Sequence, residues 1–123
     1  MKKTVLLYNF DTEQQRRAKA ALLPLHCAVK AVGEEEMLLP VGYLAGLTDN
    51  GEKRQCEGEF TGRLLVMGGF DSSDINRLLA AMKKAGFGRD IIKAVITPTN
   101  AVWCGAELYA EVYREHLQLH GKQ

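Results

Sequence analysis

This chain has little of what usually reveals a protein's chemistry. Among its 123 residues are three cysteines and three histidines, aromatic residues make up 7%, and the net charge is +1. The near balance of 16 basic and 15 acidic residues leaves no strongly basic face, so we expect no nucleic-acid partner. No apolar stretch approaches the roughly 18 residues that cross a bilayer, so we expect no membrane partner either.

The N-terminus has the basic start of an export signal but not its length. The apolar run that begins at Val5 stops at Asn9, and Asp11 follows. This run is shorter than the roughly 7–15 apolar residues of a secretory signal. The sequence therefore favours a cytoplasmic protein.

The cysteines and histidines form no recognisable reactive or metal-binding pattern. The cysteines are odd in number, widely spaced and without a C-x-x-C pair: Cys27, Cys56 and Cys104. His116 and His120 lie four residues apart on one predicted helix, but a zinc site needs three or four ligands and His26 is distant in the sequence. We therefore expect no metal, no cofactor and no disulfide.

One glycine-containing turn lies where nucleotide-binding folds hold phosphate. Gly68-Gly69-Phe70-Asp71 joins a predicted strand to a predicted helix, whose free N–H groups attract anions. Neither glycine-rich phosphate motif is present, however, and Asp71 and Asp74 place negative charge at this point. These carboxylates are better explained as caps of their own helix. The run Glu34-Glu35-Glu36 is interpreted as a solvated surface.

The strongest signal in the chain is an internal repeat. Residues 4–25 align with residues 64–85, sixty positions later, and share a phenylalanine, an aspartate, an arginine and two alanines at equivalent places. The alignment predicts two β-α-β units that superpose with the same pleats and helix faces. After a three-residue lengthening, Lys30-Ala31-Val32 matches Lys93-Ala94-Val95, and Gly42 matches Gly105.

The repeat also predicts how the chain is organised. The two copies cover residues 4–47 and 63–119, and the loop 48–62 between them is largely polar. A length of 123 residues is close to the commonest domain size. We therefore expect residues 1–123 to form a single domain.

Each copy is predicted to contain two strands and two helices. The runs 5–8 and 64–67 are continuously apolar, which is typical of central strands covered on both faces. The runs 27–32 and 91–96 each carry a lysine, which favours positions nearer an edge of the sheet. Helices are predicted at 12–23, 72–85 and 105–119, with a short remnant of a helix at 42–47.

The predicted fold is α/β (α+β), with two βαβα units sharing one four-stranded sheet. If the two halves pair antiparallel, the sheet is ferredoxin-like with additional helices. If all strands are parallel, the sheet is flavodoxin-like with helices on both faces. The lysine-bearing outer strands indicate partial exposure, which favours the ferredoxin-like arrangement.

The second half resembles a bacterial family of domains of unknown function, the one numbered 3783. The resemblance rests on Thr97-Pro98-Thr99-Asn100, on Trp103 and on the acidic helix that follows, and it covers residues 64–116. The family has no established activity, so the resemblance implies boundaries and no chemistry. Where the family would have a threonine to cap the last helix, this chain has Cys104, so the cap is either Asn100 or Cys104.

The residues of this motif, together with the glycine-containing turn at Gly68–Asp71, are the best candidates for a binding site. In a β-α-β unit both strands end at one edge of the sheet, where ligands of α/β folds usually bind. The glycines allow close approach, and the threonines, asparagine and indole offer polar contacts around an aromatic surface. A purely structural role is the alternative, in which a stiff turn and the indole hold the last helix on the core. The predicted ligand-binding residues are Gly68, Gly69, Asp71, Thr97, Thr99, Asn100 and Trp103.

Two functions stay open at this point. The first is a non-catalytic binding or interaction module, with a regulatory role, whose partner is a protein or a small molecule. The second is a small enzyme that uses Asp71 or Asp74 with Thr97 or Asn100 at the same edge. The first is favoured because no histidine, cysteine or lysine falls within that group.

We predict that the purified protein contains no stoichiometric transition metal and that its three cysteines are free thiols. The spacing of the ligands and of the thiols supports neither a zinc site nor a disulfide. Elemental analysis and thiol titration, on protein purified without reductant, measure these quantities. One zinc per chain, or fewer than three titratable thiols, would contradict the corresponding half of the prediction.

Overall fold

The computed structural model describes residues 3–55, 60–88 and 90–120, with the side chains of the last helix described up to Glu115. Strand, helix, strand and helix follow one another twice, as predicted. The strands are β1 (Thr4–Tyr8), β2 (Ala28–Ala31), β3 (Leu64–Gly68) and β4 (Ile92–Val95). The helices are α1 (Thr12–Leu22), α2 (Val41–Leu44), α3 (Ser72–Lys84) and α4 (Gly105–His120), with short 3₁₀ turns at Leu23–Leu25, Glu34–Glu36 and Asn100–Val102.

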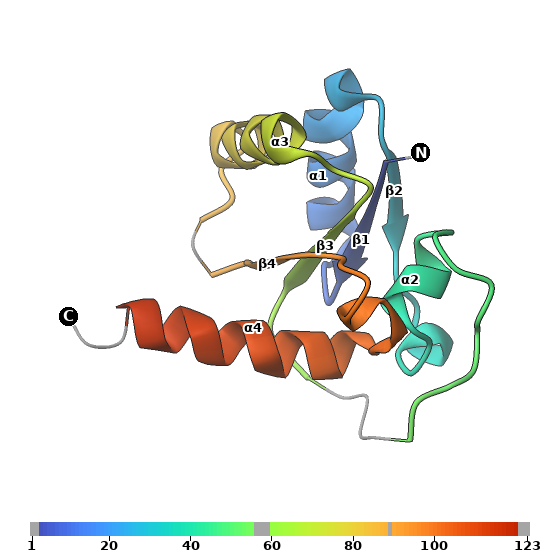
Figure 1. Cartoon of the computed structure of the whole chain (residues 1–123). Helices are drawn as coiled ribbons and strands as arrows, with labels where there is room; N and C mark the ends of the chain where they lie inside the picture. Colours follow the sequence, from blue (N-terminus) through green and yellow to red (C-terminus); the bar gives the residue numbers. More distant parts are fainter. Residues whose placement is uncertain (1–2, 56–59, 89, 121–123) are drawn as a thin grey trace.

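The four strands form one mixed sheet in the order β2-β1-β3-β4 (Figure 1). The strands of each half are parallel neighbours, whereas the two halves meet where β1 and β3 pair antiparallel. Every residue of β1 and β3 is buried. These two strands are therefore central, and the lysine-bearing β2 and β4 form the edges, as the sequence predicted.

The pairing of β1 with β3 decides between the two predicted arrangements. The α/β (α+β) class is confirmed, but the flavodoxin-like sheet is wrong because Thr4 faces Gly68 and Tyr8 faces Leu64 across an antiparallel ladder. The ferredoxin-like topology is not confirmed. That fold separates the two strands of each β-α-β unit, whereas here these strands are direct neighbours.

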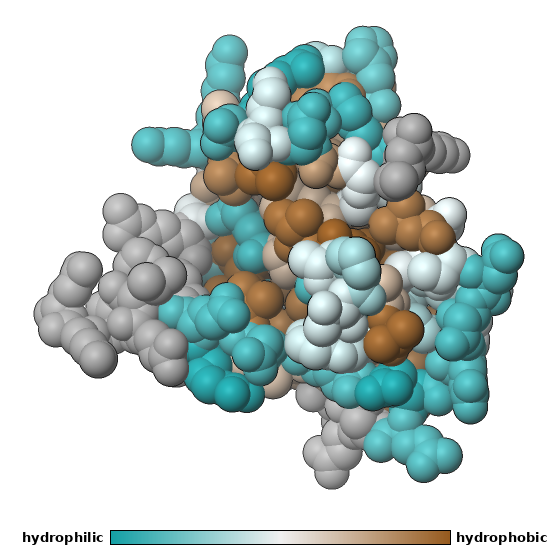
Figure 2. Space-filling model, viewed as in Figure 1, coloured by the Kyte–Doolittle hydropathy of each residue, from teal (hydrophilic) through white to brown (hydrophobic). Residues whose placement is uncertain are grey.

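Helices cover both faces of the sheet and divide the core into two parts. In Figure 1, α1 and α3 lie on one face, and α2 and α4 lie on the other. Successive side chains of a strand point to opposite faces, so Val5 and Leu7 join the core with α1 and α3 while Leu6 and Tyr8 join the core with α2 and α4. Figure 2 shows hydrophobic surface across the middle of the molecule, between polar surfaces above and below.

An aspartate caps the first helix of each half. Asp11 accepts a hydrogen bond from the Gln14 N–H at 2.7 Å, and Asp71 accepts one from the Asp74 N–H at 2.8 Å. The side chains of Gln14 and Asp74 accept in return from the backbone N–H groups of the two caps. Asp74 also contacts Lys3 Nζ at 2.8 Å, and this ammonium holds the pKa of Asp74 below its ordinary value. The expected capping role of these carboxylates is confirmed.

The register of β4 differs from the one that the repeat predicts. Lys30 lies beside Leu6 and faces α2 and α4, whereas Lys93 lies beside Leu65 and faces α1 and α3. Lys93 pairs with Leu65 at the position where, in the first half, Val29 pairs with Val5. The predicted match between the two Lys-Ala-Val triplets is therefore wrong by one residue. Because side chains alternate along a strand, this single step turns the whole triplet to the other face.

Two glycines allow helices to approach the core closely. An alanine Cβ at Gly105 would lie 2.3 Å from Tyr8 Cε2, and one at Gly42 would lie 2.8 Å from the carbonyl oxygen of Ala101. The Tyr8 ring is fully buried beneath the start of α4, and its hydroxyl finds no hydrogen-bond partner among the described residues. Burial raises the pKa of Tyr8, so the phenol stays neutral. The start of α4 can therefore reach the sheet only with a glycine at this position.

Replacing Gly105 by alanine is predicted to lower the free energy of unfolding by about 1–3 kcal/mol, because the new methyl group overlaps the Tyr8 ring. Chemical denaturation followed by circular dichroism measures this change. Gly88→Ala is the matched control, since its Cβ would meet only Asp90 Oδ1 at 3.3 Å on an exposed turn. We expect a change of less than about 0.5 kcal/mol for the control. Equal stabilities of the two variants would refute the tight contact.

Candidate ligand-binding site

The structure brings together four of the seven predicted binding residues. They line a cavity of about 330 Å³ beside β4 and α4: Thr97, Thr99, Asn100 and Trp103. The remaining three, Gly68, Gly69 and Asp71, are not among the residues that line it.

The other three predicted residues have structural roles. A Cβ at Gly68 would lie 3.2–3.3 Å from side-chain atoms of Ile96, Ala45 and Leu47, so the backbone here is already covered. Gly69 adopts a positive φ of 78°, which its turn requires. Asp71 is engaged as the cap of α3. These residues are therefore not assembled with the other four into one site.

Asn100 organises the turn after β4. Its Oδ1 accepts from the Thr97 N–H at 2.8 Å, and its Nδ2 donates to the Val95 carbonyl at 3.1 Å. The cap of α4 is instead Cys104, whose carbonyl accepts from the Leu108 N–H at 3.1 Å. Of the two caps that the sequence left open, the structure therefore assigns Cys104.

A larger cavity, of about 810 Å³, lies in the first half of the chain. It is found where β1 and β2 end, which is the corresponding edge of the other β-α-β unit. Its wall is mainly apolar, with an amide, a hydroxyl and a carboxylate added. The described residues that line it are Asn9, Phe10, Val32, Glu34, Met37, Leu38, Phe60 and Thr61. The size and the mixture of groups are typical of small-molecule sites.

The turn after β1 holds the part of the cavity wall that Phe60 and Thr61 form. Asn9 adopts a positive φ of 65°, and its Nδ2 donates to the carbonyls of Phe60 at 2.7 Å and Gly62 at 2.9 Å. Asparagine tolerates this backbone conformation better than most residues. The Phe60 ring stacks on Tyr109 of α4, with centroids 4.7 Å apart, and lies 5.8 Å from the Tyr8 ring. Hydrogen bonds from Asn9 and the ring contacts of Phe60 thus hold residues 60–62, which precede β3, in place.

An ion pair fixes the loop between the two halves. The Arg54 N–H donates to the Leu38 carbonyl at 2.9 Å, and the Arg54 guanidinium donates to both Glu107 oxygens, at 2.8 and 3.0 Å. Glu107 also accepts from the Cys104 N–H at 3.0 Å. The Arg54 guanidinium, aided by this backbone donor, lowers the pKa of Glu107 to about 2. The ion pair between Arg54 and Glu107 therefore holds the loop against the start of α4.

Glu34 is the carboxylate among the described lining residues of the larger cavity. It belongs to the acidic run after β2, in which Glu36 is already engaged with Lys30 Nζ at 3.0 Å and with the Gly33 N–H at 3.0 Å. The hydrogen bond from the Gly33 N–H is the main cause that lowers the pKa of Glu36, and the Lys30 ammonium lowers this pKa further. The exposed Glu34 side chain makes no such contact with a described residue and gives the cavity one negative charge. The described lining residues contain no histidine, cysteine or lysine.

Four of the seven predicted binding residues line the smaller cavity, and the sequence prediction missed the residues of the larger one. The signal was available, because the repeat gives both halves a carboxyl-terminal edge, and Asn9, Phe10 and Val32 lie at the edge of the first half. Phe60 and Thr61 could not have been added from the sequence. They reach the cavity only through the pairing of β1 with β3.

Neither a metal-binding cluster nor a membrane-spanning helix occurs among the described residues. Within the described part of the chain, no group of three His, Cys, Asp or Glu side chains could hold a metal ion. Cys56 and the side chains of His116 and His120 lie outside the described residues. None of the helices in the described segments is both long and apolar enough to cross a membrane.

Comparison with known proteins bears on the second half. Residues 63–119 match the family model of DUF3783, a domain of unknown function. The expected resemblance is confirmed. The DUF3783 region contains β3, α3 and β4 and the smaller cavity, whereas all described residues that line the larger cavity lie outside it. No curated protein and no solved structure matches the chain.

Replacing Glu107 by glutamine should lower the free energy of unfolding by about 1–2 kcal/mol above pH 5, because a charge-assisted pair with Arg54 is lost. The folded-state pKa of Glu107, about 2, lies below its ordinary value. The stabilisation is therefore fully present above that ordinary value and disappears as the pH falls toward 2.

Urea denaturation of both proteins between pH 2 and pH 7 measures this difference. Glu52→Gln is the matched control, since Glu52 is an exposed residue of the same loop. A Glu107→Gln penalty that stays constant across this pH range would contradict the assignment.

Proposed function

We propose that this protein is a non-catalytic binding module that holds a small, largely apolar ligand in the cavity at the ends of β1 and β2. The observation that carries the proposal is the cavity itself, about 810 Å³ in volume and mainly apolar. Phe10 and Phe60 offer aromatic surface, and Asn9, Glu34 and Thr61 offer polar contacts. The negative charge of Glu34 favours a neutral or cationic ligand group over an anionic one.

Several features support binding rather than catalysis. Nucleophilic and general-base catalysis need a nucleophile and a base within hydrogen-bond reach of each other. The described residues that line the cavity supply one carboxylate, Glu34, and one hydroxyl, Thr61, and no hydrogen bond joins these two side chains. The alternative enzyme site at Asp71 and Asn100 has little support, because both side chains are engaged in their own turns.

The composition and the paired halves also bear on where this protein acts and how it arose. We infer a bacterial protein that acts in the cytoplasm, without a nucleic-acid or membrane partner. The near-neutral charge of +1 supports this view of its partners. We also infer that the two halves arose by internal duplication, which the shared caps Asp11 and Asp71 support.

Binding of a neutral, apolar fluorescent probe, N-phenyl-1-naphthylamine, tests the proposal. We expect its emission to rise and shift to the blue when it enters the cavity. In Thr61→Trp the new indole would fill part of the cavity, so the affinity for the probe should fall about tenfold, or about 1.4 kcal/mol. Thr61 is exposed, so this variant should keep its fold.

Thr99→Trp is the matched control, because Thr99 is an exposed threonine at the smaller cavity. We expect this variant to bind the probe as the unmodified protein does. A loss of affinity in Thr99→Trp alone would place the site in the second half. No binding by the unmodified protein, or equal binding by all three proteins, would contradict the proposal.

A further inference from the structure

β4 has a backbone edge that no other described strand covers. It is the last strand of the sheet and pairs with β3 alone. The N–H groups of Ile92 and Ile96 donate toward the β3 segment, at 3.0 and 2.8 Å. Because alternate residues of a parallel strand bond to the same neighbour, the N–H and C=O groups of Lys93 and Val95 point away from β3.

Side chains of the protein close both ends of this free edge. Lys93 Nζ donates to the Ile91 carbonyl at 3.2 Å, and Asn100 Nδ2 donates to the Val95 carbonyl at 3.1 Å. Three backbone groups stay open between them: the N–H and C=O of Lys93 and the N–H of Val95. The described residues offer these groups no partner. The free edge of β4 is therefore short, with three open backbone groups between two carbonyls that already accept hydrogen bonds.

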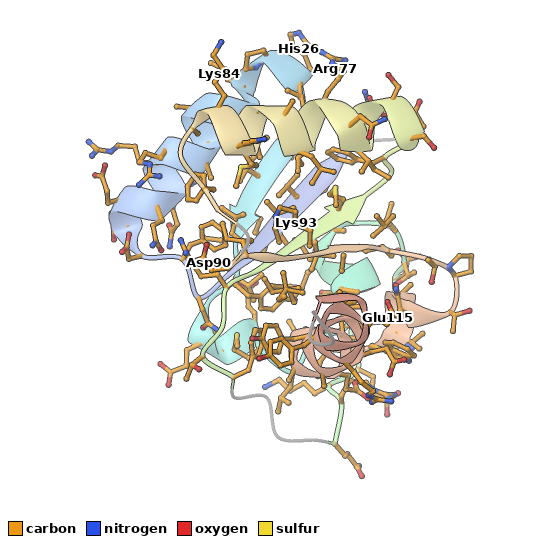
Figure 3. All side chains as sticks on the ribbon, turned by 90° about the vertical axis from the view of Figure 1, so that its left-hand side faces the viewer. His26, Arg77, Lys84, Asp90, Lys93 and Glu115 are labelled. Carbon is orange, nitrogen blue, oxygen red and sulfur yellow. The ribbon has the colours of Figure 1, made fainter. Side chains whose placement is uncertain are left out.

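The Lys93 side chain does not block this position from the side of α4. A lysine on an edge strand usually discourages pairing with other chains. Here its side chain faces the core with α1 and α3, where burial lowers the pKa of the ammonium. Figure 3 shows Lys93 on the α3 side of β4 and Glu115 on α4 beyond the opposite side.

The free edge borders the smaller cavity, which forms a groove between β4 and α4. The buried Leu108 and the half-buried Val112 and Trp103 give this groove an apolar base. Glu111 and Glu115 add two carboxylates from α4. Glu111 pairs with Arg114 at 3.3 Å, whereas the exposed Glu115 has no partner among the described side chains. The groove is therefore apolar at its base and acidic on the side of α4.

We infer that this groove binds an extended segment of a protein partner, which adds to β4 as a further strand and carries a basic side chain opposite Glu115. Strand addition uses the open backbone groups for affinity and alternate side chains for specificity. Every second residue of the added strand faces α4. The segment therefore presents an apolar and a basic residue two positions apart. This site is separate from the cavity of the proposed function.

A fluorescein-labelled nine-residue peptide, in which leucine and arginine alternate with threonine, probes the groove. Fluorescence anisotropy measures its binding. Amide hydrogen exchange, followed by NMR, then reports on the backbone. We expect the exchange of the Lys93 and Val95 amides to slow when the peptide is added, while Ile92 and Ile96, which are already bonded to the β3 segment, stay unchanged.

Two variants separate strand addition from loose adsorption. Val95→Pro removes an outward N–H and leaves the β3 ladder intact, so it should abolish binding while the circular dichroism spectrum stays the same. Glu115→Lys should weaken binding about fivefold and improve binding of a peptide in which glutamate replaces arginine. Glu52→Lys, an exposed charge reversal in the loop between the halves, is the control and should change neither affinity.

Three results would overturn the inference. The first is no binding of the peptide, and the second is binding that leaves the exchange of the Lys93 and Val95 amides unchanged. The third is a dimer of the protein alone, seen by sedimentation velocity and abolished by Val95→Pro, because a second copy would then occupy the edge. None of these results depends on the probe that tests the larger cavity, so the two proposals fail separately.

Discussion

The antiparallel contact between β1 and β3 is the interaction on which the rest of this structure depends. It joins two strands that are each buried on both faces, and it sets the end of β1 beside the start of β3. Within each half the strands are parallel, so the edge where β1 and β2 end lies at the opposite end of the sheet from the edge where β3 and β4 end. The protein therefore has two carboxyl-terminal edges, each with a cavity of its own.

The same contact makes these two edges unequal. Because β3 starts beside the end of β1, the loop between the halves has to arrive at the edge of the first half. There it contributes Phe60 and Thr61 to the larger cavity, and Asn9 and Glu107 hold it through hydrogen bonds and charge. At the other edge, side chains of Ala45 and Leu47 close over Gly68. A repeated sequence thus yields one roomy edge and one that is largely filled.

Features that depend on neighbours in the sequence were predicted well. Continuous apolar runs identified β1 and β3 as central, and a lysine within each outer run identified β2 and β4 as edges. The aspartate caps followed from residues three positions apart. The prediction for the register of β4 was wrong. The alignment of the two halves places three additional residues before Lys93, whereas the pairing of the strands places four there. Of the seven predicted site residues, the four that follow β4 line one cavity, while the three at the end of β3 and in the turn after it have structural roles.

By itself the sequence determined the elements, their order, the helix caps and the strands with two covered faces, because each of these depends on short-range periodicity and on local hydrogen bonds. Only the tertiary structure decided how the halves pair, which face Lys93 takes and which edge holds the larger cavity. These depend on contacts between residues about 50 to 60 positions apart, such as Asn9 with Phe60 and Tyr8 with Leu64. Apolar strands of this kind can pair in either direction, and only packing of the whole chain selects one.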